Sequence, residues 1–196
     1  YAMGLDPCGH FVLLASGGLD YGGGIVSGRA LVTVDSEGRH VATRESELSG
    51  ATALAVGADG TMALAGGTNV AAYVNGEVAF VQSLTTRTTD TTIQGVALTD
   101  RGTVVIVGSG GGRLSVDDLE VATRGLYGFV IELALDGTPL RSIDIQGEGR
   151  VTGHAIAYDT DGWLLVKGAT TAALTQPDLS TPAGSPVAGE YLLKLR

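Results

Sequence analysis

Four segments of the chain share one alternation of small and large apolar residues, and each segment ends at a turn glycine. In every copy two small residues, Ala or Gly, flank a large apolar one; the copies are residues 1–9, 52–60, 94–102 and 154–162. A period of two indicates a β-strand, because successive side chains of a strand point to opposite faces of its sheet. We therefore expect four equivalent strands, each with a small-residue face and a bulky face.

Further apolar runs follow each of these strands, separated by glycines and hairpin turns. A second run ends at or near a glycine in every unit, and a third is clearest at residues 30–34, 129–133 and 191–195. Turns such as Asn75-Gly76 and Asp136-Gly137 favour a hairpin into a fourth strand, because tight hairpins need positive φ angles. The expected fourth strands are residues 40–44, 77–84 and 138–145, and the second unit has a short link at residues 69–70 in place of a long loop.

A four-stranded antiparallel unit repeated every 40–60 residues or so predicts an all-β fold, a β-propeller. The expected blades are approximately residues 1–48, 49–92, 93–150 and 151–196, and the last blade lacks its outer strand. The small residues of each first strand are expected to be buried between neighbouring blades. A β-sandwich is the alternative fold, but it does not require the same small–large–small pattern four times.

Composition and charge exclude several classes of function. The chain has 31 Gly and 5 Pro among 196 residues, which suits short strands joined by tight turns better than helices. Its net charge is −9, and the 12 basic residues are scattered, so binding to nucleic acid is disfavoured. No run of 18 apolar residues is present, so we expect no membrane insertion.

Two stretches resemble bacterial cell-surface β-propeller repeats of the SBBP type, a family of seven-bladed propeller repeats. They are residues 14–41 and 107–142, each with a Gly-rich strand end, a Gly/Asp loop, an apolar strand and an Asp-x-x-Gly or similar turn; residues 167–196 resemble the same unit. The resemblance implies an extracellular, cell-surface or periplasmic location. It also implies a role in binding or scaffolding without catalytic residues.

Few residues suggest metal or cofactor chemistry, and no cofactor is expected. Asp159 and Asp161 resemble the opening of a calcium loop, but position 12 of that loop is Thr170 where a Glu would be needed. Asp117 and Asp118 form a second weak candidate without regular ligand spacing. Cys8 is interpreted as a turn residue. The three histidines, His10, His40 and His154, are not expected to converge, so we predict no metal site.

One set of polar residues has a geometric meaning in a propeller. Tyr1, Thr52, Gln94 and His154 occupy the first position of the four equivalent strands. In a propeller these positions would lie around one mouth of the central channel, where ligands often bind. They are the predicted ligand-binding residues.

The leading hypothesis is a non-enzymatic binding or scaffold module whose partner is a protein or a carbohydrate. A hydrolase or lyase with its active site in the long loops, residues 115–127 and 170–188, is one alternative, although these loops contain no His, Cys or Lys. A purely structural spacer is the other. Because the fourth blade lacks a strand, we also expect the chain to continue into a longer propeller or to pair its open edge with another chain.

Overall fold

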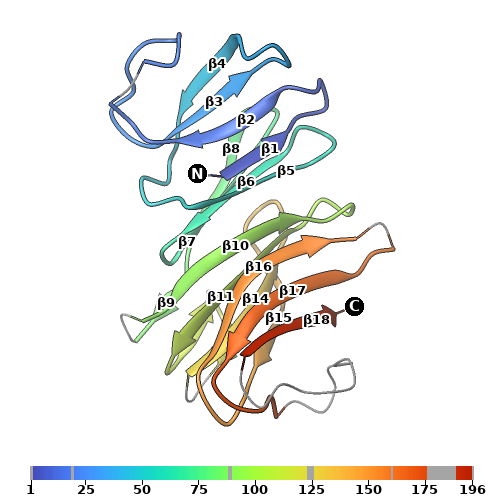
Figure 1. The fold of residues 1–196 in the computed structure, drawn as a ribbon. Helices are drawn as coiled ribbons and strands as arrows, with labels where there is room; N and C mark the ends of the chain where they lie inside the picture. Colours follow the sequence, from blue (N-terminus) through green and yellow to red (C-terminus); the bar gives the residue numbers. More distant parts are fainter. Residues whose placement is uncertain are drawn as a thin grey trace.

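The computed structural model describes residues 2–18, 20–87, 90–122, 126–159, 161–175 and 189–195. These residues form β-strands, turns and loops, and four main antiparallel sheets follow one another along the chain (Figure 1). Among the described residues, no helix has the length and apolar character that crossing a membrane requires. The predicted all-β, propeller-like architecture is confirmed.

Three of the main sheets are four-stranded meanders. The first contains β1 (Ala2–Leu5), β2 (Phe11–Ala15), β3 (Ala30–Val34) and β4 (His40–Glu45). The second contains β5 (Ala53–Val56), β6 (Met62–Gly66), β7 (Asn69–Val74) and β8 (Glu77–Ser83). The third contains β10 (Thr92–Leu98), β11 (Val104–Gly111), β14 (Leu126–Leu133) and β15 (Pro139–Ile145).

The fourth main sheet has three strands among the described residues: β16 (Val151–Tyr158), β17 (Leu164–Thr170) and β18 (Gly189–Leu195). Its outer edge is β18, as the missing outer strand of the last unit predicted. The first strands of the four sheets run side by side through the molecule, with β1 against β5, β5 against β10 and β10 against β16. Successive inner strands in contact are the arrangement of a propeller.

Two expectations about strands were wrong. The link expected at residues 69–70 is the start of β7, because the tight turn that precedes it is Gly67-Thr68 and Gly66 already pairs with Asn69. The loop expected at residues 115–127 contains β12 (Leu114–Val116) and β13 (Leu119–Ala122), which form a small additional sheet with β9 (Thr85–Thr86). This sheet is held by pairing between distant segments, which a local pattern does not reveal.

The apolar cores lie between the sheets, and the alternation in the first strands decides which residue faces which neighbour. The large residues Leu54, Val96 and Ile156 pack into clusters shared with the preceding sheet. The small residues face the following sheet: Ala53 packs toward the third sheet, and a side chain added at Gly4 would collide with Val56 of the second. Small residues thus let adjacent inner strands approach closely.

The expectation that the small residues are buried in all four units is wrong: they are half-buried in the first two units, buried in the third and exposed in the last. Ala155 and Ala157 are exposed, because no described sheet follows the fourth. At the other end of the array Met3 and Leu5 are 61% and 57% exposed, because no described sheet precedes the first. The four sheets therefore form an open array with one uncovered face at each end.

Candidate functional site

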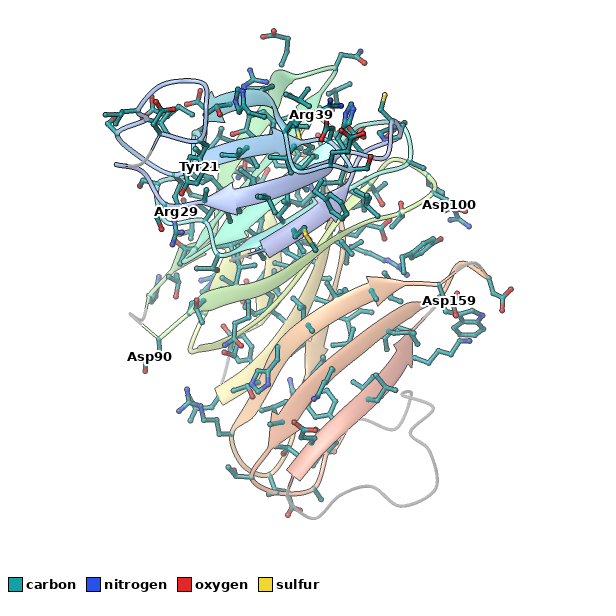
Figure 2. All side chains as sticks on the ribbon, turned by 45° about the horizontal axis from the view of Figure 1, so that its top comes forward. Tyr21, Arg29, Arg39, Asp90, Asp100 and Asp159 are labelled. Atoms are coloured by element: carbon teal, nitrogen blue, oxygen red, sulfur yellow. The ribbon has the colours of Figure 1, made fainter. Side chains whose placement is uncertain are left out.

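The turns between the first two strands of each sheet form one rim of the molecule, and a polar pocket lies along this rim. Figure 2 shows Asp100 and Asp159 at this edge and Asp90 at the opposite one. The pocket lies between the third and fourth sheets and has a volume of about 470 Å³. It is lined by Thr99, Arg101, Glu132, Arg141, Tyr158, Asp161 and Gly162.

A hydrogen-bonded group of side chains shapes the floor of this pocket. Glu132 on β14 is only 13% exposed and accepts hydrogen bonds from the Thr103 hydroxyl at 2.6 Å and from Arg141 Nε on the neighbouring strand β15. The pairing of β14 with β15 places Glu132 opposite Arg141, so the ion pair follows from the register. The pair fixes one guanidinium group inside the pocket.

The wall of the pocket includes Tyr158 at the end of β16. Its hydroxyl donates to Asp100 Oδ1 at 3.0 Å, which joins the first turns of the third and fourth sheets. This hydrogen bond, with smaller contributions from burial and the Asp100 charge, raises the pKa of Tyr158. Arg101 is exposed beside it and forms no ion pair with the described residues. The pocket therefore presents one uncommitted cation, a tyrosine hydroxyl and carboxylates.

A second pocket of about 410 Å³ occupies the corresponding position between the second and third sheets. Its lining includes Val56, Asp59, Leu98 and Asp100, but no arginine or lysine. Equivalent hollows thus lie at two of the three interfaces between the described sheets, and of these two the one beside the fourth sheet is lined by arginine side chains.

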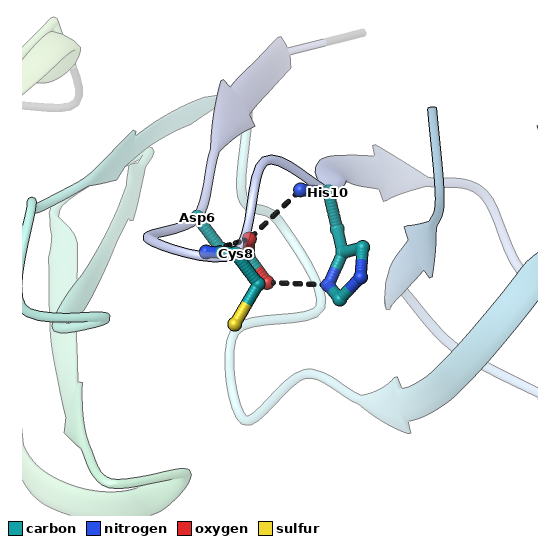
Figure 3. Close-up of side chains that lie close together, drawn as sticks. All are labelled: Asp6, Cys8 and His10. Carbon is teal, nitrogen blue, oxygen red and sulfur yellow. Dashed lines mark hydrogen bonds and ion pairs between the residues drawn. The ribbon is translucent and has the colours of Figure 1, made fainter. Parts of the chain in front are cut away.

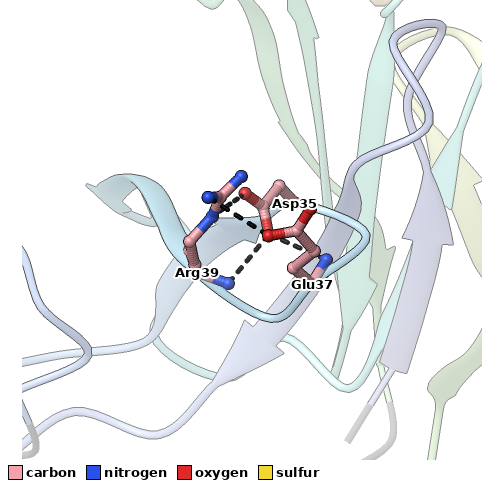
Figure 4. Close-up of polar contacts among 3 residues, drawn as sticks. All are labelled: Asp35, Glu37 and Arg39. Carbon is pink, nitrogen blue, oxygen red and sulfur yellow. Dashed lines mark hydrogen bonds and ion pairs between the residues drawn. The ribbon is translucent and has the colours of Figure 1, made fainter.

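Three of the described hairpin turns share one scheme, in which the aspartate at residue 6, 35 or 159 accepts hydrogen bonds from amides two and four residues later. In the β3–β4 turn Asp35 Oδ1 accepts from the amides of Glu37 and Arg39, both at 2.9 Å (Figure 4). Arg39 also pairs with Asp35 Oδ2 at 2.7 Å and with Glu37 at 3.1 Å. The Arg39 side chain, followed by these backbone amides, holds the pKa of Asp35 below its ordinary value.

The first turn follows the same scheme with different side chains. Asp6 Oδ1 accepts from the amides of Cys8 at 2.9 Å and His10 at 2.8 Å, and Asp6 Oδ2 lies 3.0 Å from His10 Nδ1 (Figure 3). Partial burial raises the pKa of Asp6, but the hydrogen bonds from His10 and Cys8 outweigh it, so the net pKa is lowered. From the sequence, Cys8 and His10 were interpreted as separate residues. The sequence signal for their proximity is the two-residue interval from Asp6 to Cys8 and from Cys8 to His10.

The predicted channel-mouth residues remain a prediction. Tyr1 lies outside the described residues, and Thr52 is exposed just before β5. Gln94 Nε2 donates to Ser109 Oγ at 3.4 Å, and His154 Nε2 lies 2.8 Å from Thr152 Oγ1. Each of these two side chains thus bonds within its own sheet, and no hydrogen bond within the described part of the chain joins one to the other.

The weak calcium candidates have other partners. Asp159 Oδ1 accepts from the amides of Asp161 and Trp163, and its Oδ2 lies 3.1 Å from Lys194 Nζ. Asp117 occupies a left-handed conformation in the β12–β13 turn and accepts from Gln82 Nε2 at 3.1 Å, while Asp118 is exposed. Both aspartates thus have partners within the protein, and their role as metal ligands stays an untested possibility of the sequence.

The fold has counterparts among solved structures. A luciferin-regenerating enzyme matches 99% of this chain at 17% identity with a TM-score of 0.52, and a protein described as a putative gluconolactonase matches 98% at 14% identity with a TM-score of 0.50. An extracellular domain from B. thetaiotaomicron matches 97% at 12% identity with a TM-score of 0.38. The chain spans 60%, 57% and 37% of the lengths of these three structures.

The expectation that this chain is not an enzyme is contradicted, because two solved structures of the same fold are named as enzymes. The absence of His, Cys and Lys from the long loops therefore does not exclude catalysis on this fold. No protein-family model and no curated protein matches the sequence. At these identities the likeness extends to the fold alone: this chain shares a β-propeller-like architecture with proteins named as enzymes.

Proposed function

We propose that the protein acts outside the cytoplasm as a β-propeller that binds a carbohydrate carrying an acidic group, in the pocket beside the fourth sheet. The observation that carries this proposal is the polar lining of that pocket, in which Arg101 is exposed and in no ion pair with described residues. A guanidinium group binds a carboxylate through two parallel hydrogen bonds. The volume of the pocket, about 470 Å³, suits a small ligand.

The remaining lining residues suit the hydroxyl groups of a sugar. The Tyr158 hydroxyl donates to Asp100 and can still accept a hydrogen bond from a sugar, and Asp161 offers a carboxylate that accepts further hydrogen bonds. Glu132 and Arg141 hold each other in place and need little reordering when a ligand enters. The location outside the cytoplasm rests on the resemblance to surface repeats, and fractionation of the producing cells tests it.

Binding to a panel of acidic and neutral oligosaccharides, followed by calorimetry, tests the ligand. We expect uronic-acid or sialic-acid sugars to bind, and their neutral analogues to bind at least tenfold more weakly. Arg101→Ala should weaken binding at least tenfold, and Arg87→Ala, an exposed arginine outside the pocket, should not. Equal binding by Arg101→Ala and the unaltered protein would refute the proposal, as would binding of a protein partner alone. The same experiment should also test whether the bound sugars are chemically converted, because two solved structures of this fold are named as enzymes.

We also propose that the exposed face of the first sheet packs against a further four-stranded sheet of a longer propeller. The three interfaces between the described sheets support this partner, because each joins a bulky face to a small-residue face. Met3 and Leu5 present such a bulky face without a neighbour. A complementary sheet would carry Ala or Gly on the facing side of its inner strand.

A further inference from the structure

Three different metal-binding side chains meet in the turn between β1 and β2. Asp6, Cys8 and His10 each offer a ligand atom that lies within 4.8 Å of the other two. Figure 3 shows the thiol of Cys8 and the imidazole of His10 on either side of the Asp6 carboxylate. Cys8 is exposed, and the side chains of His10 and Asp6 are 30% and 21% exposed, so an ion could reach all three from solvent.

The turn holds these side chains together before any ion binds. Asp6 Oδ1 is fixed by the amides of Cys8 and His10, the Asp6 amide donates to the carbonyl of His10 at 2.9 Å, and Gly9 takes the positive φ of 79° that closes the turn. Because the backbone is already ordered, binding costs mainly the side-chain freedom of Cys8 and a small adjustment of His10.

The turn does not itself require a cysteine and a histidine. The β3–β4 turn has the same backbone hydrogen bonds around Asp35, yet its two variable positions hold Glu37 and Arg39, which form ion pairs (Figure 4). An arginine at the last position cannot bind a metal, because it carries no acceptor. In the first turn both variable positions hold ligand residues.

We propose that Asp6, Cys8 and His10 form an open site for a divalent transition metal of the zinc type. Thiolate and imidazole ligands select Zn²⁺ and related ions over Mg²⁺ and Ca²⁺, which prefer oxygen ligands alone. Around tetrahedral zinc, ligand atoms at about 2.0–2.3 Å from the metal lie about 3.3–3.8 Å apart. The Asp6 and His10 atoms are already 3.0 Å apart, and rotation of the exposed Cys8 side chain brings its sulfur closer. Water or a ligand group would fill the fourth position.

Cobalt titration of the reduced, chelator-treated chain tests the site, because a thiolate bound to Co²⁺ gives a strong charge-transfer absorption. We expect one equivalent of Co²⁺ to produce this band and Zn²⁺ to abolish it. Cys8→Ser should remove the band, and His10→Gln should weaken Co²⁺ binding at least tenfold. His40→Ala is the matched control, since His40 lies outside the cluster and bonds to Thr43; it should behave like the unaltered chain.

Alkylation of Cys8 by iodoacetamide provides a second readout. One equivalent of Zn²⁺ should slow the reaction at least tenfold in the unaltered chain and in His40→Ala, but not in His10→Gln. Circular dichroism of each variant checks that the sheets are intact. Absence of the thiolate band, or alkylation that Zn²⁺ does not slow, would overturn the proposal and leave Cys8 as an exposed turn residue. Neither readout depends on sugar binding, so failure of this site is distinguishable from failure of the proposed function.

Discussion

Two buried tyrosines differ in one hydrogen bond, and this difference sets their effect on stability. The hydroxyl of Tyr127 has no hydrogen-bond partner within the described part of the chain, and neither has Asp144 Oδ1 nearby. Burial, with the negative charge of Asp144, raises the pKa of Tyr127 to about 12. The hydroxyl of Tyr191, by contrast, donates to the carbonyl of Thr152 at 3.0 Å.

We predict that Tyr127→Phe raises the free energy of unfolding at pH 7 by about 1 kcal/mol, because it removes a buried polar group without a partner. Tyr191→Phe is the matched control and should lower the free energy of unfolding by about 0.5–1.5 kcal/mol, because it deletes a hydrogen bond. Urea unfolding of the three chains measures both changes. A loss of stability in Tyr127→Phe equal to that in Tyr191→Phe would contradict this reading of the unpartnered hydroxyl.

The raised pKa of Tyr127 predicts that the free energy of unfolding depends on pH in the alkaline range. The pKa of Tyr127 is higher in the folded chain, at about 12, than the ordinary tyrosine value of 10.0. Between pH 10 and 12 the unfolded chain therefore loses the tyrosine proton before the folded chain does, and the free energy of unfolding falls as the pH rises through this interval. Tyr127→Phe should accordingly lose less stability over this interval than the unaltered chain.

At the scale of the strand, the small residues of the inner strands contribute to packing only where another sheet faces them. Ala53 on β5 packs into the core shared by the second and third sheets. Ala155 holds the equivalent position on β16, and Ala157 lies two residues later on the same face; both are exposed, because no described sheet covers them. Identical residues at equivalent positions therefore have different energetic roles.

We predict that Ala53→Leu lowers the free energy of unfolding by about 1–3 kcal/mol, because extra methyl groups overpack a close interface. Ala157→Leu should change it by no more than about 0.5 kcal/mol, because the new side chain points into solvent. Thermal and urea unfolding of the two variants measure the difference. Equal destabilisation by both substitutions would mean that another sheet covers the fourth one.

At the scale of the whole molecule, the bulky face of the first sheet stands out because no described sheet covers it. Met3 is 61% exposed, whereas its equivalent in the third sheet, Val96, is 7% exposed. Leu5, Ile25 and Met3 are among the most exposed large apolar side chains of the described chain. Exposed apolar surface of this kind supports the proposed contact with a further sheet.

We predict that the isolated chain self-associates through this face at high concentration. The double substitution Met3→Lys and Leu5→Lys should shift it to a monomer in sedimentation experiments, because charged side chains cannot be buried unpaired. Val78→Lys is the control, since Val78 is exposed on β8, away from this face, and the variant should associate like the unaltered chain. A monomeric unaltered chain that binds no apolar dye would contradict the prediction.

Local patterns in the amino-acid sequence determined the strands, their order and the two faces of each inner strand. Alternation of Ala53 and Leu54, or Ala157 and Ile156, is a property of neighbouring residues, and a strand converts it directly into opposite faces. Turn chemistry is equally local: Asp35 accepts from amides two and four residues away, whatever the rest of the molecule does.

Only the tertiary structure decided which faces are covered and which polar groups meet. The exposure of Ala157 and Met3 depends on whether another sheet stands opposite, which no local pattern contains. The pocket beside the fourth sheet joins Arg101, Glu132 and Asp161 from three separate segments, and the pairing of β12 with β9 joins residues almost thirty positions apart. Sheet packing brings these groups together through contacts between distant segments. The pocket and the additional sheet therefore could not be predicted from local sequence patterns.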